Sequence, residues 1–538
     1  MPDVEAKPAA LRKLQEGEDS ARQSYWLATI VTDVPMEFRP EDNLRRPFKP
    51  ALYDLFLKLE FSKLIDKYNL SPSRPAEEKP SCTVTVERIG DRHRAEAMLA
   101  QWRQAETVTV YALPDLSVLS VQWDTGEDTA VAAELQKDTY AGDWHALLAA
   151  LFSADVCKVS HNVKDMMRAL LEQDLPIDGF VFDTALAAYL LDATAGSYDL
   201  PRLFVAYFNE ELPKPAHLER DAFAPLGDTA AAWAALHSYC SAVAALYDIL
   251  PEKLREKDMT ELYETVELPL CAVLARMERR GFLVDGTALA AFGEDMAEKI
   301  KELEQRIYEA AGEKFNINSP KQLGTVLFEK MKLPHGKKTK TGWSTNADVL
   351  EKLRWQHPIV ADVLEYRQYS KLKSTYADGL LKVIDVDGRI RTSFQMTVTA
   401  TGRLSSTEPN LQNIPTRTDL GSEIRRMFVP ADGCVLVDAD YSQIELRILA
   451  HMAGDEGMRE AFLSGGDFHA ETAAKVFHVA RKDVTHEMRR SAKAVNFGIV
   501  YGISAFSLSQ DIGVTVAEAK AYMEAYFATF PGVRKYMD

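Results

Sequence analysis

Two acidic residues stand in a segment whose pattern could serve phosphoryl chemistry. Residues 434–452 read CVLVDADYSQIELRILAHM, in which four apolar residues lead into Asp438 and Asp440 and a helical pattern follows. If 434–437 form a buried strand, both acids lie on one face, about 6.6 Å apart along the backbone. Acids at the end of a buried strand need a cation or donors, and phosphoryl-transfer enzymes use them to hold Mg²⁺. The alternative is that Asp440 only caps the helix.

A second segment combines cations and aromatic rings at a spacing of four. In RRSAKAVNFGIVYG, residues 489–502, these are Arg489, Lys493, Phe497 and Tyr501. Four helical residues turn through about 400°, so the four side chains share one stripe. Its cationic end suits phosphates and its aromatic end suits a base or sugar, as a nucleoside triphosphate requires. The alternative is an ordinary amphipathic helix with core aromatics and solvated cations.

A third segment is polar and locally basic. Residues 399–417, TATGRLSSTEPNLQNIPTR, are poor in apolar side chains, and 389–426 contain six arginines against three acids. Four lysines and no acid occur across 332–345. Such loops suit contacts to phosphates and to the minor groove, and solvated surface loops are the alternative.

Composition limits the class of protein. The 538 residues are 46% hydrophobic and 27% charged, which excludes a disordered chain, a collagen and a coiled-coil rod. The net charge of −17 means that any nucleic acid must meet a local basic surface. The five cysteines form no CxxC pair, the start lacks a signal peptide, and no apolar run could span a bilayer. We therefore expect a cytoplasmic protein with reduced thiols and no membrane contact.

The elements that would position these residues follow from periodicity. A proline-rich linker is expected at 71–80, after a helical stretch at 50–68. From 82 to about 250, strands at 83–89, 107–113 and 116–123 and helices at 145–152, 183–191 and 230–250 predict an α/β domain with a mixed sheet. From 259 to 377 the pattern is mostly helical, with Ser319 as an N-cap and Thr345 and Asp348 as a capping box. Strands are expected at 389–398 and 434–440, then helices to the end.

Several long motifs in the correct order resemble family A DNA polymerases, the bacterial DNA polymerase I group. DADYSQIELR is similar to a palm motif, RRSAKAVNFGIVYG to the fingers helix and TGRLSSTEPNLQNIP to the primer–template segment. FNINSPKQLG and KKTKTGWSTNADVL resemble the thumb. The resemblance covers roughly residues 20–538 and is strongest after 260.

The resemblance implies a multidomain fold of α/β plus α+β class. An RNase H-like exonuclease-type domain would precede the thumb, partial palm and partial fingers of a right-hand polymerase. The expected domains are a remnant of a 5′-nuclease tail with a linker (1–80), a degenerate 3′–5′ exonuclease-like domain (81–255), a thumb with the start of the palm (256–378), a partial palm (379–450) and partial fingers (451–538).

The same resemblance implies template-directed DNA synthesis from dNTPs on primer–template DNA, with two Mg²⁺ ions. Asp440 and the Tyr441 carbonyl would hold the metal, and Lys493 would protonate the leaving pyrophosphate. Phe497, standing where a tyrosine would favour dideoxynucleotides, implies poor acceptance of them. The catalytic residues would be Asp440, Arg489 and Lys493, and the nucleotide contacts Tyr441, Gln443, Glu445 (the gate against a ribose 2′-hydroxyl), His469, Arg489, Lys493, Phe497 and Tyr501. The DNA contacts would be Arg403, Asn410, Gln412, Asn413, Arg417, Lys338 and Lys340.

The sequence departs from the family pattern in the exonuclease-like domain. Positions that carry metal-binding acids in the family hold Tyr111, Leu113, Met166 and Val243, and Asp165 only neighbours one of them. Tyrosine, leucine, methionine and valine side chains cannot form a two-metal site. We therefore predict a domain without proofreading activity that is kept as a scaffold.

A second departure concerns the last palm motif, His-Asp-Glu, which supplies another metal carboxylate in the family. After Tyr501 the only acids are Asp511, Glu518, Glu524 and Asp538, and Asp438 is a poor surrogate. The sequence thus predicts a large fragment truncated before the palm is complete and inactive alone. The alternative is a non-catalytic fragment that grips primer–template DNA and needs a second polypeptide to polymerise. We expect it in the bacterial cytoplasm, near the nucleoid.

Overall fold

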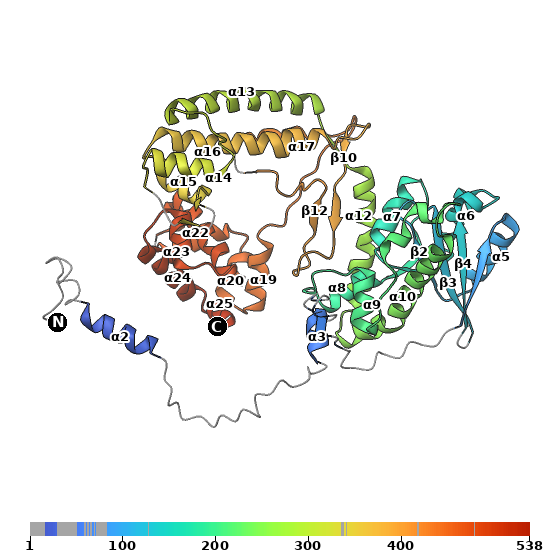
Figure 1. The fold of residues 1–538 in the computed structure, drawn as a ribbon. Helices are drawn as coiled ribbons and strands as arrows, with labels where there is room; N and C mark the ends of the chain where they lie inside the picture. Colours follow the sequence, from blue (N-terminus) through green and yellow to red (C-terminus); the bar gives the residue numbers. More distant parts are fainter. Residues whose placement is uncertain are drawn as a thin grey trace. The chain divides into compact units, whose positions relative to one another are not determined.

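The computed structural model describes residues 17–29, 51–58, 83–126, 129–334, 338–339, 342–416, 419–477 and 479–538, with positions 61, 64, 67, 68 and 70. The chain divides into two compact units, residues 1–429 and 430–538, which are described separately (Figure 1). Helices α2 (Glu18–Ala28) and α3 (Ala51–Lys58) precede the first domain. The expected linker at 71–80 lies outside the described residues.

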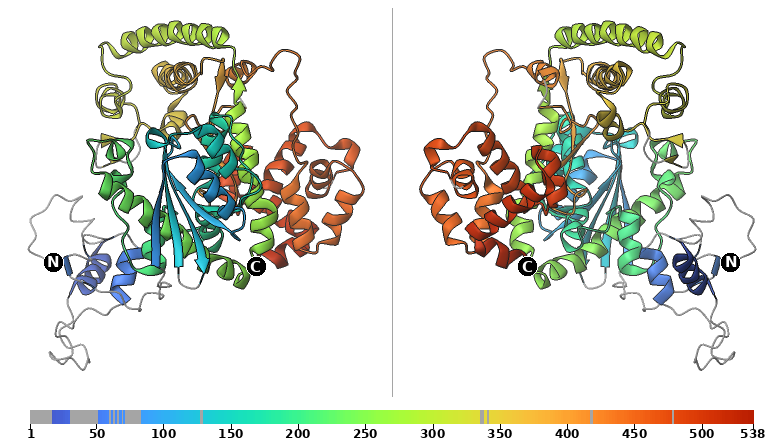
Figure 2. Two further views of the ribbon diagram at one scale, coloured as in Figure 1. Left: turned by 90° about the vertical axis from the view of Figure 1, so that its right-hand side faces the viewer. Right: turned by 90° about the vertical axis from the view of Figure 1, so that its left-hand side faces the viewer.

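A six-stranded mixed sheet organises the α/β domain, as the sequence predicts (Figure 2). The strand order is β1-β4-β3-β2-β5-β6. Strand β3 pairs antiparallel with β4 and β2, and the other neighbours pair in parallel. The strands are β1 (Thr83–Ile89), β2 (Val108–Ala112), β3 (Val118–Gly126), β4 (Thr129–Gln136), β5 (Lys158–Ser160) and β6 (Phe180–Asp183).

Helices cover this sheet and confirm the three expected near 145, 183 and 230. They are α5 (Arg92–Trp102), α6 (Trp144–Leu151), α7 (Val163–Glu172), α8 (Thr184–Leu191), α9 (Leu200–Phe208) and α10 (Thr229–Glu256). The long helix α10 packs against β2 and β3. The core between sheet and helices includes Trp102, Val121, Phe152 and Leu246, all almost fully buried. Burial of this apolar surface is the main force that holds the domain together.

Polar side chains fasten α10 to the sheet. The Nδ1 atom of His237 lies 3.1 Å from the Ser120 hydroxyl, and its Nε2 lies 3.1 Å from Glu134 Oε1. Arg88 Nε donates to the other Glu134 oxygen at 3.0 Å. Although a serine, a histidine and a glutamate are aligned, Ser120 has 0% exposure and cannot reach a substrate. The arrangement therefore satisfies buried polar groups.

A helical segment follows, as predicted for 259–377. Short turns α11 (Thr260–Leu262) and η5 (Tyr263–Glu267) lead into α12 (Leu268–Arg280), and α13 then packs along α16 (Figure 1). Ser319 caps α14 by accepting a hydrogen bond from Gln322 N, which confirms that prediction. The remaining elements are α13 (Gly286–Ala311), α14 (Pro320–Gly324), η6 (Thr325–Lys330), β8 (Lys338–Thr339), β9 (Gly342–Trp343), α15 (Ala347–Leu353), α16 (Pro358–Lys371), η7 (Leu372–Ala377) and α17 (Asp378–Leu381).

The expected capping box at Thr345 is wrong by one residue. Asn346 caps α15, and its side chain accepts a hydrogen bond from Val349 N at 3.1 Å. Thr345 is buried, and its hydroxyl accepts from Arg367 Nη2 at 3.1 Å. Because Arg367 also binds the Thr345 carbonyl, a tertiary contact occupies the threonine and leaves capping to the next residue.

The strand predicted at 389–398 forms as two short strands. β10 (Arg389–Ile390) pairs with β7 (Phe282–Leu283), while β11 (Ser393–Gln395) pairs with β12 (Ser405–Thr407). Between them the Thr392 hydroxyl bonds to Ser406 Oγ at 2.7 Å and to the Pro409 carbonyl at 2.8 Å. The chain thus changes pairing partner at Thr392, and helix α18 (Asp419–Arg426) follows.

Unit 2 is helical, and its helices gather into a bundle (Figure 2). They are α19 (Ile444–Met452), α20 (Glu456–Leu463), α21 (Phe468–Val476), the short η8 (Arg481–Asp483), α22 (His486–Val500), α23 (Ala505–Ile512), α24 (Val516–Thr529) and α25 (Pro531–Met537). The core includes Met458, Phe468, Val495, Tyr526 and Phe530. This confirms the expected run of helices to the end.

The predicted buried strand at 434–440 is wrong. These residues have no strand geometry, and Val435 and Val437 are 79% and 84% exposed. A strand needs a neighbour to satisfy its N–H and C=O groups, and none of the described residues pairs with this segment. The same-face arrangement inferred for Asp438 and Asp440 therefore does not occur here.

Candidate functional site: a charged cavity in the helical unit

Unit 2 contains a cavity of about 430 Å³ formed by three separate segments. These are the loop before α19 with its first turn, the start of α21, and one face of α22. Eight of the nine residues expected at a nucleotide and metal site line it; Ser442 and Ile444 were not expected. The lining residues are Asp440, Tyr441, Ser442, Gln443, Ile444, Glu445, His469, Arg489, Lys493 and Phe497.

Helix α22 presents the predicted stripe to this cavity. Arg489, Lys493 and Phe497 all line it. The buried face of the same helix is made by other residues, among them Val495 and Ile499. Arg489 and Lys493 therefore point away from the core face of α22, whereas Phe497 both lines the cavity and packs against the core of unit 2.

An acid outside the cavity lining holds Arg489 in place. Arg489 Nε donates to Asp467 Oδ2 at 2.6 Å. Asp467 also caps α21 through His469 N and Ala470 N. Burial raises the pKa of Asp467, but these hydrogen bonds and the Arg489 charge outweigh it and lower that pKa. Since guanidinium carries five N–H donors, Arg489 keeps donors for an anion in the cavity.

His469 is almost completely buried at the cavity wall. Its Nδ1 lies 2.9 Å from Asn496 Nδ2 on α22. Burial, and then the nearby Arg489 charge, lower the pKa of His469 to about 4. The imidazole is therefore neutral at pH 7 and acts through hydrogen bonds.

The loop before α19 leaves Asp440 open. Gln443, with φ of 54°, is the N-cap residue of α19, so the alternative role of Asp440 as a helix cap is wrong. Arg447 Nε donates to the Ser442 carbonyl at 2.9 Å and ties the loop to the helix. Within the described part of unit 2, no hydrogen bond or ion pair engages the exposed Asp440 carboxylate. An exposed carboxylate without such a partner suits a hard divalent cation.

Glu445 and Tyr501 are joined at the edge of the cavity. The Tyr501 hydroxyl donates to Glu445 Oε2 at 2.7 Å. Tyr501 follows the last turn of α22 and is exposed, and it does not line the cavity itself. Asp440 and Glu445 are the two carboxylates in the lining, and no group of three or more possible metal-binding side chains occurs among the described residues.

The segment expected to bind DNA belongs to unit 1. Arg403, Asn410, Gln412 and Asn413 are exposed around the β11–β12 hairpin. Gln412 Nε2 donates to the Leu404 carbonyl at 3.0 Å. Among the other expected contacts, Lys338 lies on β8, whereas Lys340 and Arg417 lie outside the described residues.

This hairpin is anchored on the α/β domain. Its residues Phe394, Met396 and Leu404 pack against the α/β core. The Tyr189 hydroxyl donates to the Thr399 carbonyl at 2.8 Å. The apolar core and Tyr189 of the α/β domain thus hold the hairpin that carries the polar segment.

The four exonuclease-like positions carry no acid, and two of them, Leu113 and Val243, are closed while Tyr111 and Met166 are half-buried. Leu113 and Val243 are buried in apolar clusters, and the Tyr111 ring lies 5.3 Å from the Tyr239 ring. Burial raises the pKa of the Tyr111 phenol. Asp165, the neighbouring acid, pairs with Lys164 at 2.7 Å.

Sequence reasoning missed three structural partners. Asp467 and Asn496 hold Arg489 and His469, and Glu278 forms a buried ion pair with Lys164 at 2.7 Å. Asp467 could have been found as an N-cap before a helical pattern. The other two depend on contacts between distant segments, which the local sequence pattern does not encode.

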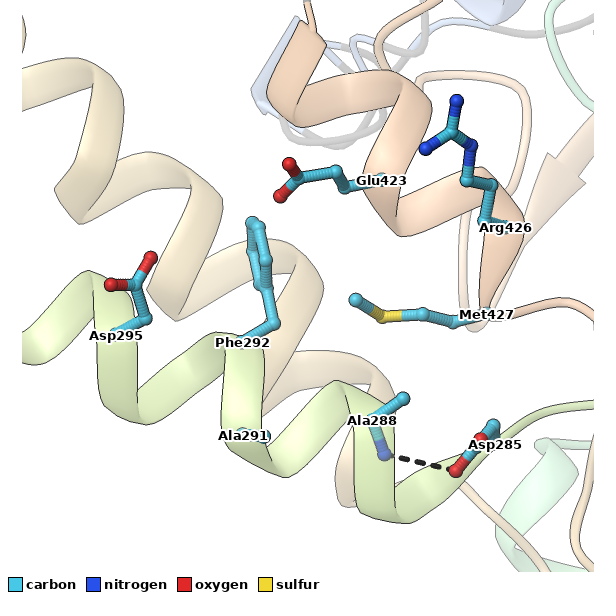
Figure 3. A pocket seen from close by; sticks show the side chains of 8 residues that line it. All are labelled: Asp285, Ala288, Ala291, Phe292, Asp295, Glu423, Arg426 and Met427. Atoms are coloured by element: carbon cyan, nitrogen blue, oxygen red, sulfur yellow. Dashed lines mark hydrogen bonds between the residues drawn. The ribbon is translucent and has the colours of Figure 1, made fainter.

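A second cavity, also of about 430 Å³, lies between α13 and α18 (Figure 3). Phe292 and Met427 face it, and charged side chains surround them. Asp285 caps α13 through Ala288 N. No residue predicted from the sequence lines this cavity, whose eight residues are Asp285, Ala288, Ala291, Phe292, Asp295, Glu423, Arg426 and Met427.

None of the described helices is both long enough and apolar enough to span a bilayer.

Comparisons with known proteins find similar sequences and a similar solved structure. The profile of DNA polymerase family A matches residues 286–538. DNA polymerase I of Caldicellulosiruptor bescii is 40% identical over 538 residues, covering 99% of this chain and 59% of its own length. The Geobacillus stearothermophilus DNA polymerase I is 41% identical, covering 98% of this chain and 60% of its own length. The chain thus spans about three-fifths of these relatives.

A solved structure is similar to this chain in its fold as well as in its sequence. It is the POL domain of Pol1 from M. smegmatis in complex with DNA primer-template and dNTP. It shares 36% identity and a TM-score of 0.72, over 84% of this chain and 78% of that one. On the motifs, the profile match and this structural similarity, the chain belongs to DNA polymerase family A.

Proposed function

We propose that the protein serves template-directed DNA synthesis, in which a primer 3′-hydroxyl attacks the α-phosphate of a bound dNTP. The observation that carries this proposal is the convergence of Asp440, Arg489 and Lys493 on one cavity of unit 2. A carboxylate and two cations around one space match a metal–triphosphate complex.

Asp440 and the Tyr441 carbonyl would hold Mg²⁺, for which an open carboxylate and a backbone oxygen are fitting ligands. When bound, the two metal ions of such a site would stabilise charge on the attacking and leaving oxygens. The chain's own cations would orient the triphosphate. Arg489, already positioned by Asp467, binds phosphate oxygens, and Lys493 supplies a proton to the leaving pyrophosphate.

The remaining cavity residues would select the nucleotide. Phe497 would lie against the sugar, and Gln443 and His469 would donate hydrogen bonds to the triphosphate. The hydrogen bond from Tyr501 holds Glu445, which supports its role in excluding a ribose 2′-hydroxyl. A fixed side chain excludes an extra hydroxyl more sharply than a mobile one does.

Primer–template DNA would bind to the exposed polar segment of unit 1. Arg403 would contact the minor groove at the primer terminus, with Asn410, Gln412 and Asn413 beside it. Arg417, Lys338 and Lys340 remain predictions for contacts to the DNA backbone, as does a cytoplasmic, nucleoid-associated location.

The α/β domain would contribute no proofreading. At the positions of the expected acids it has Tyr111, Leu113, Met166 and Val243, none of which is a carboxylate, and Leu113 and Val243 are buried. We propose that it supports the DNA-binding hairpin instead, because Tyr189 and the apolar core hold that hairpin.

One observation favours a second candidate, a fragment that binds primer–template DNA without transferring nucleotides. The cavity is lined by two carboxylates, and Tyr501 already engages Glu445. Residues 502–538 contain no His-Asp-Glu motif, and their four acids do not line the cavity.

Formation of a ternary complex tests the proposal without requiring transfer. Residues 1–538 are mixed with Mg²⁺ and a primer–template whose primer ends in a dideoxynucleotide, and each dNTP is added in turn. We expect the dNTP complementary to the template to stabilise the complex more than the other three, and Asp440→Ala to remove the difference. Equal effects of all four dNTPs would contradict template-directed recognition.

Primer extension on an ordinary primer then separates the two candidates. With all four dNTPs, the fragment reading predicts binding without extension. Extension that disappears in Asp440→Ala would show that these residues suffice for transfer and would reject the fragment reading.

A further inference from the structure

His469 makes different hydrogen bonds through its two ring nitrogens. Nδ1 lies 2.9 Å from the Asn496 side-chain amide, whereas Nε2 makes no hydrogen bond within the described residues. A neutral imidazole carries its proton on only one nitrogen. The hydrogen bond at Nδ1 therefore determines whether Nε2 is a hydrogen-bond donor or an acceptor. Because His469 lines the cavity, this choice decides whether the cavity wall presents a donor or an acceptor.

The orientation of the Asn496 amide follows from Thr472. The Thr472 hydroxyl donates to the Phe468 carbonyl at 2.9 Å, which uses its single proton. Its oxygen can then only accept, and Asn496 Nδ2 lies 3.4 Å from it. The nitrogen of the amide therefore faces Thr472, and the same nitrogen faces His469.

The number of buried polar atoms without a hydrogen-bond partner supports the same orientation of the Asn496 amide. Asn496 has 0% exposure, and its Oδ1 has no partner within the described residues. Reversing the amide would leave two N–H donors unpaired in place of one acceptor. Since each buried unpaired polar group costs about 1–3 kcal/mol, the observed orientation is the cheaper one.

We infer that Asn496 is a positioning residue that fixes His469 as the Nε2–H tautomer, so that the cavity receives an N–H donor for the triphosphate. Asn496 Nδ2 donates a hydrogen bond to His469 Nδ1, so this ring nitrogen must be unprotonated. The proton of the neutral ring therefore resides on His469 Nε2. The inference rests on the proposed function for its ligand, but the tautomer itself is a property of the protein alone.

The charged neighbours of His469 agree with a neutral ring. Burial, Arg489 and Lys493 lower its pKa, and Asp467 acts in the opposite direction without prevailing. With Arg489 and Lys493 beside it, an imidazolium would add a third adjacent positive charge. A neutral donor contacts phosphate oxygens without that repulsion.

Selective ¹⁵N labelling of histidine in residues 1–538 tests the tautomer at pH 8.5. The sequence has 11 histidines, and the His469 signals are those lost in a His469→Gln variant. We expect Nε2 protonated and Nδ1 bare. A protonated Nδ1, or a mixture of tautomers, in the unaltered protein would overturn the inference, and this measurement needs no folded variant at Asn496.

An Asn496→Asp variant tests the consequence for nucleotide binding. The carboxylate can only accept, so the His469 proton should move to Nδ1 and the cavity should face a lone pair. We expect dNTP affinity in the ternary complex to fall about tenfold or more, as for a lost hydrogen bond to a charged group. Ser491→Ala, a buried change on the same helix, is the matched control and should leave affinity unchanged.

These experiments distinguish failure of the proposed function from failure of the inference about His469. If the unaltered protein binds no dNTP, the proposed function fails while the ¹⁵N spectrum still reports the tautomer. If dNTP binds and Asn496→Asp moves the proton without weakening binding, His469 does not act through Nε2 and the inference is overturned.

Discussion

The family resemblance leads us to expect metal or nucleotide chemistry in two regions of this protein. The two regions differ in whether the side chains at the expected positions are apolar and buried or charged and exposed. In the α/β domain, Leu113 and Val243 fill such positions and are buried among apolar side chains. In unit 2, Asp440 and Lys493 are exposed around a cavity of about 430 Å³. Burying an unpaired charge is costly, so the charges around the cavity stay exposed, where a ligand can reach them, whereas the apolar positions form part of a core.

The ion pairs of the two regions differ in the same way. Lys164 and Glu278 are buried, and Glu278 Oε1 also accepts from Phe394 N at 2.7 Å. Arg489 and Asp467 are both partly exposed. The first pair therefore joins α7 to α12 inside the fold, whereas the second positions a cation that still has donors to offer.

The largest expected effect comes from breaking the buried pair. Glu278→Ala removes the buried partner of Lys164 and leaves it only the exposed Asp165 carboxylate, which should cost about 3–5 kcal/mol of unfolding free energy. Chemical denaturation of the purified variant measures it. The double variant Lys164→Met with Glu278→Met should recover much of the loss. A Glu278→Ala protein as stable as the unaltered one would refute the account of this pair.

A smaller effect is expected at the edge of the cavity. Tyr501→Phe removes the hydrogen bond that holds Glu445, worth about 0.5–1.5 kcal/mol. Discrimination between dNTP and rNTP in the ternary complex should therefore fall by about two- to tenfold. Unchanged discrimination would show that Glu445 needs no tether from Tyr501.

The exposed pair should matter little for stability. Asp467→Asn keeps a capping side chain on α21 but removes the ion pair with Arg489, so unfolding free energy should drop by less than about 1 kcal/mol. The dNTP affinity should fall more clearly, because Arg489 loses its positioning contact. A stability loss as large as that of Glu278→Ala would erase the distinction between the two pairs.

The smallest expected effect is a pH dependence in the α/β domain. Burial raises the pKa of Glu134, but hydrogen bonds from His237 and Arg88 outweigh it and leave the pKa below its ordinary value. A carboxyl with a lowered folded pKa adds stability above its unfolded pKa, and this stability is lost as pH falls through the folded value.

Thermal unfolding of the unaltered protein and Glu134→Gln from pH 7 to pH 3 measures that contribution. The unaltered protein should be more stable at pH 7, and the two curves should converge at the acid end. A difference that stays constant over the whole range would contradict the assigned pKa direction.

Local patterns predicted much of the fold and of the site. The mixed sheet and the helical run after 259 follow from periodicity within single segments, and the structure confirms them. Three of the four residues of the predicted stripe on α22 line the cavity. The strand at 434–440 failed because a strand depends on a neighbour that no local pattern specifies. Thr345 failed for a similar reason, since Arg367 takes its hydroxyl.

The supporting residues of the site were beyond local prediction. Asn496 lies next to Phe497 inside the best motif, yet its role depends on His469 and Thr472 of another helix. Asp467 is likewise defined by Arg489, 22 residues further along the chain. Side chains that act through one another are paired by folding, and a single sequence shows only their types.

The central claim, that the cavity of unit 2 holds the triphosphate of a dNTP, is tested most directly by a matched pair of lysine variants. Lys493 lines the cavity, whereas Lys520 is exposed on α24 and pairs with Glu524. The dNTP dissociation constant is measured in the ternary complex with Mg²⁺ and primer–template. We predict that Lys493→Ala weakens dNTP binding by about tenfold or more while primer–template affinity and Lys520→Ala stay near the unaltered values. Equal dNTP affinity in the two variants would contradict the account.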